Sequence, residues 1–204
     1  MATGVSSAIW QPALFGATES ASRRRALDPT SWVEVVPGWL PDADALFAHL
    51  LESVAWQQRE RRMYEKLLPE PRLTAEIGDL ARAPHPSLRD AAEALSTQYG
   101  VRYDHLWLNL YRDGRDSTAW HGDRISCRRE ECVVPVLTLG ATRRFLLKPR
   151  RGGTSLVFKP AAGDLVVMGG RCQRDWVHSV PKAADVVGAR ISINFQSSEQ
   201  ARLG

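Results

Sequence analysis

The segment His105-Leu-Trp-Leu-Asn-Leu-Tyr111 alternates leucine with polar or aromatic side chains. A repeat of two residues predicts a β-strand that packs its leucines on one side and presents Trp107, Asn109 and Tyr111 on the other. The segment Arg190-Ile-Ser-Ile-Asn-Phe-Gln196 repeats the pattern near the end of the chain. Together the two segments predict a sheet with one packed face and one face that lines a cavity.

Most of the chain after residue 103 has the same strand character. Short apolar segments are separated by glycine-containing turns at 140–141, 151–153 and 162–164, as is typical of an all-strand region. We predict a mainly β fold with N-terminal helices, an α+β arrangement whose core is a double-stranded β-helix, or jelly roll, of about eight strands. Besides the strand near residue 121, the expected strands are 105–111, 133–139, 144–147, 155–158, 164–168, 176–180 and 189–195.

The first half of the chain predicts helices and one strand. Apolar residues at helical spacing predict helices over 41–55 and from residue 86 to Gly100, where glycine ends the second helix. We expect Trp10 and Phe15 to dock part of an N-terminal extension on the domain, because an apolar tip is unsuited to a free tail. The expected organisation is an extension over 1–28 and one domain over 29–204, with a strand at 32–36, a helical region over 29–102 and the jelly-roll core over 103–197.

Two histidines and one aspartate have the pattern of an iron site. His121 and Asp123 are separated by one glycine, so both side chains point to the same side of an extended segment. His178 lies far along the chain, as expected if several strands intervene before the chain returns to the metal. Two imidazoles and one carboxylate occupy one face of a ferrous ion and leave the other face open. The alternative is an exposed His-Gly-Asp turn that binds no metal.

Arg190 is expected to point into the cavity of the predicted sheet, where a cation requires an anionic partner. A dicarboxylate co-substrate supplies one, since a guanidinium holds a carboxylate through two parallel hydrogen bonds while the keto-acid end binds iron.

These motifs resemble those of the AlkB-like dioxygenases, which depend on Fe(II) and 2-oxoglutarate and reverse alkylation damage in nucleic acids. The resemblance covers roughly residues 30–197. It implies that His121, Asp123 and His178 bind the iron, that Arg190 binds the distal carboxylate of 2-oxoglutarate, and that Asn109 and Tyr111 assist it. The motifs that carry it are Asn109-Leu-Tyr111-Arg-Asp-Gly114, His121-Gly-Asp123, His178-Ser-Val-Pro181, Arg190-Ile-Ser192 and Pro71-Arg72-Leu73-Thr74.

The chain also departs from the family pattern. Ser192 and Gln196 replace an asparagine and a second arginine in the last strand, and loss of a charged hydrogen-bond partner is expected to weaken 2-oxoglutarate binding by about 1–3 kcal/mol. Glu76 lies in a segment where relatives that stack a flipped base carry an aromatic residue. Ile125 replaces an acid that binds the damaged base in some relatives. The identity of the base is therefore open.

The reaction that the resemblance implies is oxidative demethylation of alkylated DNA, with O2 consumed and formaldehyde and succinate released. A base must leave its stack to reach the iron, and a methylated base leaves most easily. Two alternatives remain: the same chemistry on RNA, a protein or a small metabolite, and a non-catalytic relative that only binds nucleic acid. The candidate substrate contacts are Met63, Tyr64, Arg72, Trp120, Arg124 and Ile125. Met63 and Tyr64 in an ordinary loop, Trp120 in the core and a solvated Arg124 are the competing interpretations.

Composition adds weaker expectations. The net charge of +4 comes mainly from arginine clusters, such as those at 59–62 and 128–129, which either contact phosphates or reflect the base composition of the genome. Cys127, Cys132 and Cys172 are odd in number and lack a paired spacing, which predicts reduced thiols rather than a disulfide framework. We expect no signal peptide and no membrane span, because the start of the sequence lacks an apolar stretch of signal-peptide length and no apolar run reaches about 18 residues. We expect a cytoplasmic monomer.

Overall fold

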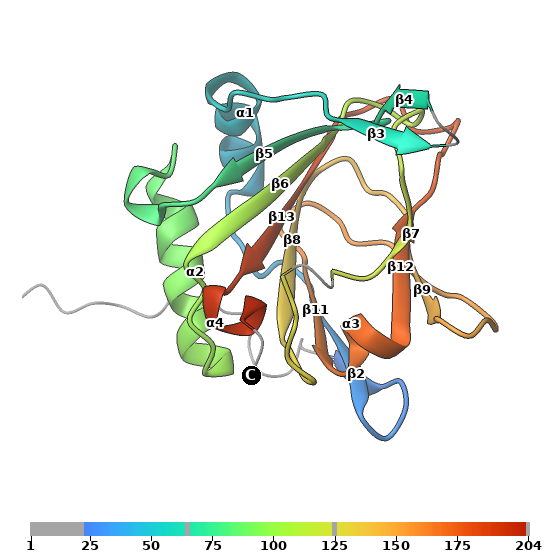
Figure 1. The fold of residues 1–204 in the computed structure, drawn as a ribbon. Helices are drawn as coiled ribbons and strands as arrows, with labels where there is room; N and C mark the ends of the chain where they lie inside the picture. The colour runs from blue at the N-terminus through green and yellow to red at the C-terminus, as the bar shows by residue number, and fades with distance from the viewer. Residues whose placement is uncertain (1–22, 64–65, 124–125, 203–204) are drawn as a thin grey trace, which may run out of the picture.

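Two antiparallel sheets form the body of the protein. In this computed structural model, residues 23–63, 66–123 and 126–202 are described, and residues 61–63 and 66 are described by their backbone alone. Figure 1 shows the large sheet on the left and the small sheet on the right, with the helices α1 and α2 on the face of the large sheet that points away from the small sheet.

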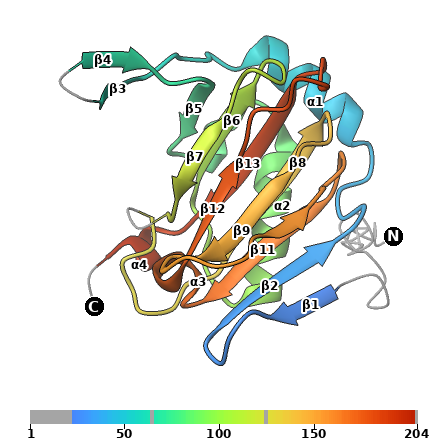
Figure 2. The same cartoon turned by 90° about the vertical axis from the view of Figure 1, so that its right-hand side faces the viewer.

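The large sheet has seven strands and the small sheet has four. The order in the large sheet is β1 (Arg23–Ala26), β2 (Ser31–Val36), β11 (Leu165–Gly170), β8 (Val134–Gly140), β13 (Arg190–Gln196), β6 (His105–Tyr111) and β5 (Leu73–Ile77). The order in the small sheet is β10 (Leu156–Phe158), β9 (Phe145–Pro149), β12 (Trp176–Val180) and β7 (Thr118–His121). A separate hairpin joins β3 (Glu60–Met63) to β4 (Lys66–Pro69) and extends from one end of the molecule in Figure 2.

Two long helices cover the outer face of the large sheet. Helix α1 (Ala43–Ser53) buries Leu46 and Leu50 against the sheet, and α2 (Pro86–Tyr99) begins at a proline and ends before Gly100, whose φ of 65° favours glycine. Three short helical segments complete the described elements: η2 (Leu80–Arg82), α3 (Cys172–Asp175) and α4 (Ser198–Ala201).

The alternation along the strands divides the interior into two apolar clusters. Leu106, Leu108 and Leu110 of β6 pack with the helices on one side of the large sheet. Tyr111 belongs to the second cluster, which fills the space between the two sheets and includes Phe145 of β9. The side of the large sheet that faces the small sheet therefore carries the polar residues predicted to line a cavity.

The predicted jelly roll is confirmed. The strands β6 to β13 are the eight strands expected after residue 103, and both predicted helices are present. Residues Arg23–Ala26, at the end of the predicted extension, pair with β2 as a further strand. The expected docking of Trp10 and Phe15 lies outside the described residues. No helix in the described part of the chain has both the length and the apolar character needed to cross a membrane.

One prediction about the cysteines was wrong. Cys127 and Cys132 form a disulfide in the segment between β7 and β8, while Cys172 is a buried free thiol. Cys127 and Cys132 are five positions apart in the sequence. The count and spacing of the cysteines did not reveal the pair, because the pairing depends on how the segment between them folds back on itself.

Candidate metal and co-substrate site

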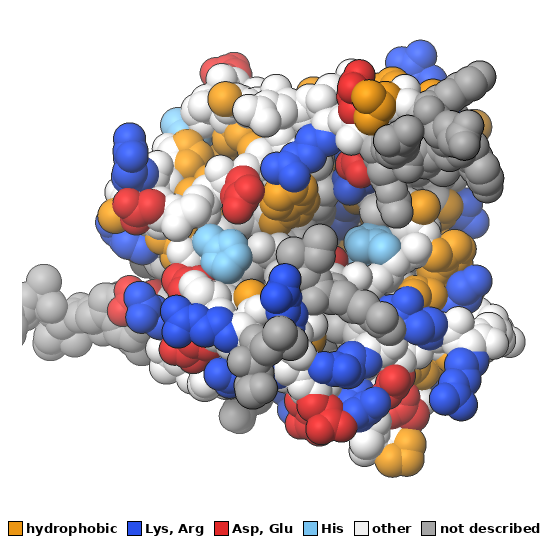
Figure 3. Space-filling model, viewed as in Figure 1, with side chains coloured by type: hydrophobic (Ala, Val, Ile, Leu, Met, Phe, Trp, Pro, Cys, Tyr) orange, Lys and Arg blue, Asp and Glu red, His pale blue; other side chains and the backbone are white. Residues whose placement is uncertain are grey.

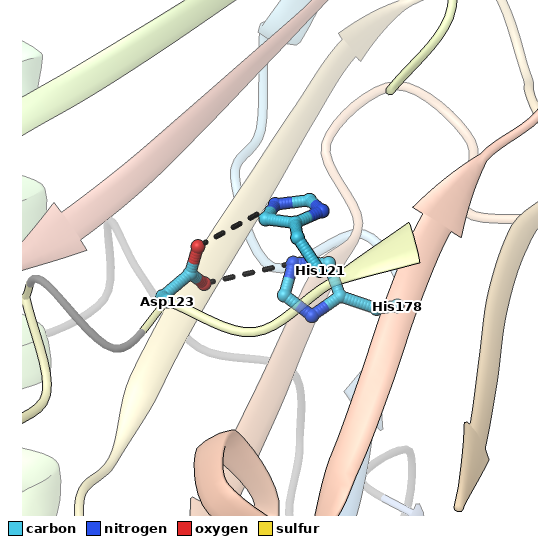
Figure 4. Close-up of side chains that lie close together, drawn as sticks. All are labelled: His121, Asp123 and His178. Atoms are coloured by element: carbon cyan, nitrogen blue, oxygen red, sulfur yellow. Dashed lines mark ion pairs between the residues drawn. The ribbon is translucent and has the colours of Figure 1, made fainter. Parts of the chain in front are cut away.

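The three predicted metal ligands meet between two neighbouring strands of the small sheet. His121 ends β7 and lies opposite His178 of β12, while Asp123 follows two residues after His121. The Asp123 carboxylate oxygens lie 3.6 Å from Nε2 of His121 and 3.6 Å from Nε2 of His178 (Figure 4). These distances exceed those of ordinary hydrogen bonds, and the ligand atoms all lie within 4.8 Å of one another. One ion can therefore contact all three side chains.

The residues around the triad fix its geometry. Nδ1 of His121 donates a hydrogen bond to the carbonyl oxygen of Ala119 at 2.8 Å, which leaves Nε2 as the nitrogen with a free lone pair. The side-chain oxygen of Gln173 accepts a hydrogen bond from the backbone N–H of Asp123. A Cβ at Gly122 would lie 2.6 Å from the carbonyl oxygen of Gln173. Glycine is thus required for the close approach of this loop to α3.

Burial of His178 and of one Asp123 oxygen makes the triad suitable for a cation. Loss of solvation lowers the pKa of His178 to about 4, so its ring is neutral and can donate a lone pair near neutral pH. One oxygen of Asp123 is buried and has no hydrogen-bond partner among the described residues. An unpaired buried carboxylate oxygen is costly, and a divalent ion bonded to it removes that cost. The residues present therefore fit Fe(II), the ion that two histidines and a carboxylate suit.

A cavity of about 540 Å³ opens beside the triad, between the two sheets. Its size lies within the roughly 300–1,000 Å³ range of small-molecule sites. The metal ligands line it on the side of the small sheet, and residues of β5, β6 and β13 line it on the side of the large sheet.

Arg190 provides a cation at the inner end of this cavity, and no carboxylate among the described residues pairs with it. Its side chain is 1% exposed, and burial lowers its pKa from the ordinary value because the charged form loses solvation. One guanidinium nitrogen donates a hydrogen bond to Oγ1 of Thr138, whereas Nε and Nη1 have no acceptor among the described residues. Each of these unpaired N–H groups can donate a hydrogen bond to a carboxylate oxygen. The structure thus fits the predicted contact with the distal carboxylate of 2-oxoglutarate.

Asn109, Tyr111 and Ser192 line the cavity as the sequence predicted. The amide nitrogen of Asn109 donates a hydrogen bond to Oγ of Ser192 at 3.1 Å, so the serine at this position serves as a hydrogen-bond acceptor for Asn109. The hydroxyl of Tyr111 hydrogen-bonds Oγ1 of Thr118 at 2.8 Å. These contacts hold the polar face of β6 and β13 in one arrangement before a co-substrate binds.

The outer part of the cavity contains further side chains. Gln196 lines it six residues along β13 from Arg190, and His105 lies opposite Gln196 in the strand pairing. Glu76 of β5 lies opposite Trp107 of β6. The sequence places Glu76 where the resemblance implies an aromatic residue, and the structure supplies an aromatic ring to the cavity from the neighbouring strand instead.

The predicted substrate contacts have different outcomes. Arg72 lines the cavity and donates a hydrogen bond to the side-chain oxygen of Asn109 at 2.9 Å. Trp120 is 38% exposed, does not line the cavity and lies under the ammonium group of Lys148, so neither of its proposed positions, the cavity floor or the core, is found. The side chain of Met63 and residues Tyr64, Arg124 and Ile125 lie outside the described part of the structure.

Sequence analysis missed three residues that support the site. Thr118, Thr138 and Gln173 contact Tyr111, Arg190 and Asp123 respectively. The strand pattern carried a partial signal for the two threonines, because each is a polar residue within or beside an apolar strand segment. Gln173 gave no signal, since its neighbour in space is 50 residues away in the chain.

Comparison with known proteins places these features in a wider group. A protein-family model described as the 2OG-Fe(II) oxygenase superfamily matches residues 33–196. The alpha-ketoglutarate-dependent dioxygenase alkB homolog 3 of Rattus norvegicus is 31% identical over 196 residues, which cover 84% of this chain and 66% of the relative. The homolog 3 protein of Homo sapiens is 30% identical, with 84% and 68% covered. The chain thus spans about two thirds of the length of these relatives.

A DNA oxidative demethylase, ALKBH2 of Arabidopsis thaliana, is 31% identical over 135 residues, which cover 54% of this chain and 43% of the relative. Among solved structures, a prolyl hydroxylase from Trichoplax adhaerens superposes with a TM-score of 0.60 at 11% identity and covers 83% of this chain and 85% of its own. The structure of OsALKBH1 gives a TM-score of 0.55 at 12% identity and covers 86% and 100%. Because the identities are this low, the two structures show a shared fold and nothing more.

Proposed function

This chain belongs to the 2OG-Fe(II) oxygenase superfamily and to its AlkB-like members, and from that premise we propose that it demethylates alkylated bases in nucleic acid, with DNA as its substrate. It is an Fe(II)- and 2-oxoglutarate-dependent dioxygenase. The observation that carries the proposal is the joint placement of the three metal ligands and Arg190 around one cavity.

The residues of the site have distinct tasks in this reaction. His121, Asp123 and His178 hold the metal, and Arg190 orients 2-oxoglutarate through its distal carboxylate. Bound Fe(II) supplies the oxidation, in which 2-oxoglutarate and O2 yield succinate, carbon dioxide and one oxygen atom inserted into a substrate C–H bond. A hydroxymethyl group formed on a ring nitrogen then leaves as formaldehyde and restores the base. The ring of Phe145 stacks on the ring of His178 and shields it from solvent on that side.

Cationic side chains in the segment after Asp123 and on α3 support a polyanionic substrate. The segment after Asp123 carries the exposed Arg128 and Arg129, and the guanidinium of Arg174 donates hydrogen bonds to both of their carbonyl oxygens. Figure 3 shows Lys and Arg side chains gathered across the lower part of the face seen in Figure 1. Positive charge along a nucleic-acid path contributes affinity that does not depend on sequence.

The choice of DNA rests on the name of one relative, the DNA oxidative demethylase ALKBH2. We propose in addition that the protein acts as a monomer in the cytoplasm.

The experiment compares single- and double-stranded DNA and RNA oligonucleotides that carry the same methylated base. Formaldehyde and succinate are measured with Fe(II), 2-oxoglutarate and ascorbate. The proposal expects formaldehyde from at least one DNA oligonucleotide at a higher kcat/KM than from its RNA counterpart. A higher kcat/KM on RNA would identify RNA instead of DNA as the substrate. If no methylated oligonucleotide releases formaldehyde, the proposal is overturned.

A further inference from the structure

Arg150 connects the turn after β9 to the end of α3 and the start of β12. Its backbone N–H donates a hydrogen bond to the carbonyl oxygen of Asp175 at 2.8 Å, which extends the pairing of β9 with β12 by one residue. Its guanidinium donates to three further carbonyl oxygens, from Nε to that of Arg174 at 2.7 Å and from Nη2 to those of Gln173 and Trp176 at 3.4 and 3.3 Å. One residue thus bonds four consecutive carbonyl groups.

These bonds satisfy the backbone at the end of a very short helix. Helix α3 has four residues, and the N–H of Trp176 donates to the carbonyl oxygen of Cys172. The last carbonyl groups of a helix have no donor within the helix, and here Arg150 supplies one to each carbonyl from Gln173 to Trp176. A single helical turn is marginal on its own, because few hydrogen bonds offset the entropy of ordering it. The guanidinium therefore supplies order that α3 lacks by itself.

Helix α3 in turn holds the loop that carries Asp123. The side-chain oxygen of Gln173 accepts a hydrogen bond from the backbone N–H of Asp123 at 2.8 Å. The same loop borders Arg150, because a Cβ at Gly122 would lie 2.7 Å from Nη2 of Arg150 and 2.6 Å from the carbonyl oxygen of Gln173. The peptide between His121 and Asp123 therefore lies on a surface that Arg150 and Gln173 form together.

A second connection leads from Arg150 to His178. Helix α3 runs directly into β12 (Figure 1), whose first residue is Trp176 and whose third is His178. Arg150 bonds the carbonyl oxygen of Trp176, while the indole N–H of Trp176 donates to a carboxylate oxygen of Asp28 at 2.6 Å. The start of the strand that carries His178 is thus fixed from two sides, and Arg150 is one of them.

Two other arginines contact α3 but serve different segments. Arg171 pairs with Asp175 within the same short segment. Arg174 donates hydrogen bonds to the carbonyl oxygens of residues 128 and 129. Among the described residues, Arg150 is the arginine whose guanidinium bonds both α3 and the first residue of β12.

We propose that Arg150 is a positioning residue for the metal centre, because its guanidinium holds α3 and the start of β12 where Asp123 and His178 can bind one ion. The inference concerns the iron site and does not depend on the nucleic-acid substrate. Without the guanidinium, the ion has to order α3 and the loop as it binds, and that ordering lowers its affinity. Loss of a partner behind the ligands commonly lowers metal affinity by about 10–100-fold.

Replacing Arg150 with methionine removes the three side-chain hydrogen bonds and keeps the backbone N–H that bonds Asp175. The variant should bind Fe(II) roughly tenfold more weakly or worse, as measured by anaerobic calorimetric titration of the metal-free protein without oligonucleotide. Arg151→Met is the matched control, because Arg151 is the next residue of the same turn, is exposed and makes no side-chain hydrogen bond to the described part of the chain. The control loses the same charge and should retain its Fe(II) affinity within about twofold.

A spectroscopic measurement separates positioning from general stability. Co(II) binds the same kind of ligand set as Fe(II), and its visible spectrum reports how the ligands are arranged around the ion. Arg150→Met should alter the Co(II) bands, whereas Arg151→Met should match the wild-type protein. Arg150→Lys keeps the charge but cannot bond several carbonyl groups from one rigid plane, so its Fe(II) affinity should lie between those of Arg150→Met and the wild-type protein.

Equal Fe(II) affinities in Arg150→Met and Arg151→Met, or matching Co(II) spectra in the two variants, would overturn the inference. Thermal unfolding of the metal-free variants checks that each is folded. If Arg150→Met does not fold, Arg150→Lys and Arg151→Lys provide the same comparison, and equal Fe(II) affinities would again overturn the inference. A loss of affinity confined to the Arg150 variants supports it even if no methylated oligonucleotide releases formaldehyde, so the inference and the proposed function can fail separately.

Discussion

The side-chain oxygen of Gln173 accepts a hydrogen bond from the backbone N–H of Asp123 at 2.8 Å. Gln173 is 1% exposed, and its amide nitrogen contacts the sulfur of Met168. The contact joins α3 to the loop that carries the metal-binding carboxylate. Gln173 is therefore a positioning residue for Asp123.

Replacing Gln173 with methionine should weaken iron binding. The variant preserves the volume of the buried side chain but leaves the N–H of Asp123 without its acceptor, and loss of such an outer partner lowers metal affinity by about 10–100-fold. Calorimetric titration of the metal-free protein with Fe(II) under anaerobic conditions measures the change. Gln200→Met is the matched control, because Gln200 is a buried glutamine that bonds the backbone of Val133 away from the metal. Equal iron affinities in the two variants would contradict the positioning role.

Replacing Arg190 with lysine should raise KM for 2-oxoglutarate. Lysine retains the charge but cannot offer two parallel hydrogen bonds to a carboxylate, so the loss should be roughly tenfold or more. Arg190→Met should abolish turnover at ordinary co-substrate concentrations. The initial rate of succinate release at varied 2-oxoglutarate gives KM.

Arg143→Lys is the control for this series. Arg143 is buried to the same extent as Arg190, but its guanidinium donates hydrogen bonds to the carbonyl oxygens of Asp113, Asp116 and Pro181. The control variant should lose stability without a change in KM for 2-oxoglutarate. An unaltered KM in Arg190→Lys would show that the co-substrate carboxylate binds elsewhere.

Replacing Gln196 with arginine restores the charge that the family pattern predicts. If this position contacts the co-substrate, KM for 2-oxoglutarate should fall roughly tenfold, since a hydrogen bond to a charged group contributes about 1.5–3 kcal/mol. Steady-state kinetics with varied 2-oxoglutarate and varied oligonucleotide separates a change in KM for 2-oxoglutarate from a change in KM for the oligonucleotide. A change confined to KM for the oligonucleotide would instead place Gln196 in the substrate part of the cavity.

Reduction of the Cys127–Cys132 disulfide should destabilise the domain. The bond closes a short loop directly after the metal ligand Asp123, and the backbone N–H of Cys127 donates to the carbonyl oxygen of Asp123 at 2.9 Å. Chain entropy for so short a loop corresponds to about 2 kcal/mol, or roughly 4–8 °C in Tm for a domain of this size. Thermal unfolding with and without a thiol reductant measures the shift. Cys172→Ser should show the same shift, and Cys127→Ser should show none.

The sequence predicted the elements whose pattern is strong and local. Alternation over 105–111 and 190–196 predicted strands and their cavity-facing residues, because a period of two fixes which side chains share a face. The metal ligands were predictable, because His-x-Asp followed by a distant histidine is a pattern that few sites other than an iron site require. Strand β5 was missed although its Arg72-Leu73-Thr74 motif was noted, because Ala75 and Glu76 weaken the apolar pattern and pairing with β6 decides it.

Contacts between distant segments could not be predicted from the sequence. The pairing of Arg59 with Trp107 depends on how the segment before β3 passes over β6, and nothing in either local pattern specifies this. The same is true of Trp120. Its place beside a metal ligand suggested burial, but alternation along β7 turns its side chain away from that of His121 toward Lys148.

The most direct test of the account is the stoichiometry of the two products in the wild-type protein and in Asp123→Ala. With Fe(II), 2-oxoglutarate and a 3-methylcytosine oligonucleotide, the wild-type protein should release formaldehyde and succinate in a ratio near one to one. Asp123→Ala should release neither while showing a thermal transition like that of the wild-type protein. Formaldehyde release that persists in folded Asp123→Ala, or its absence from the wild-type protein with every methylated oligonucleotide, would contradict the account.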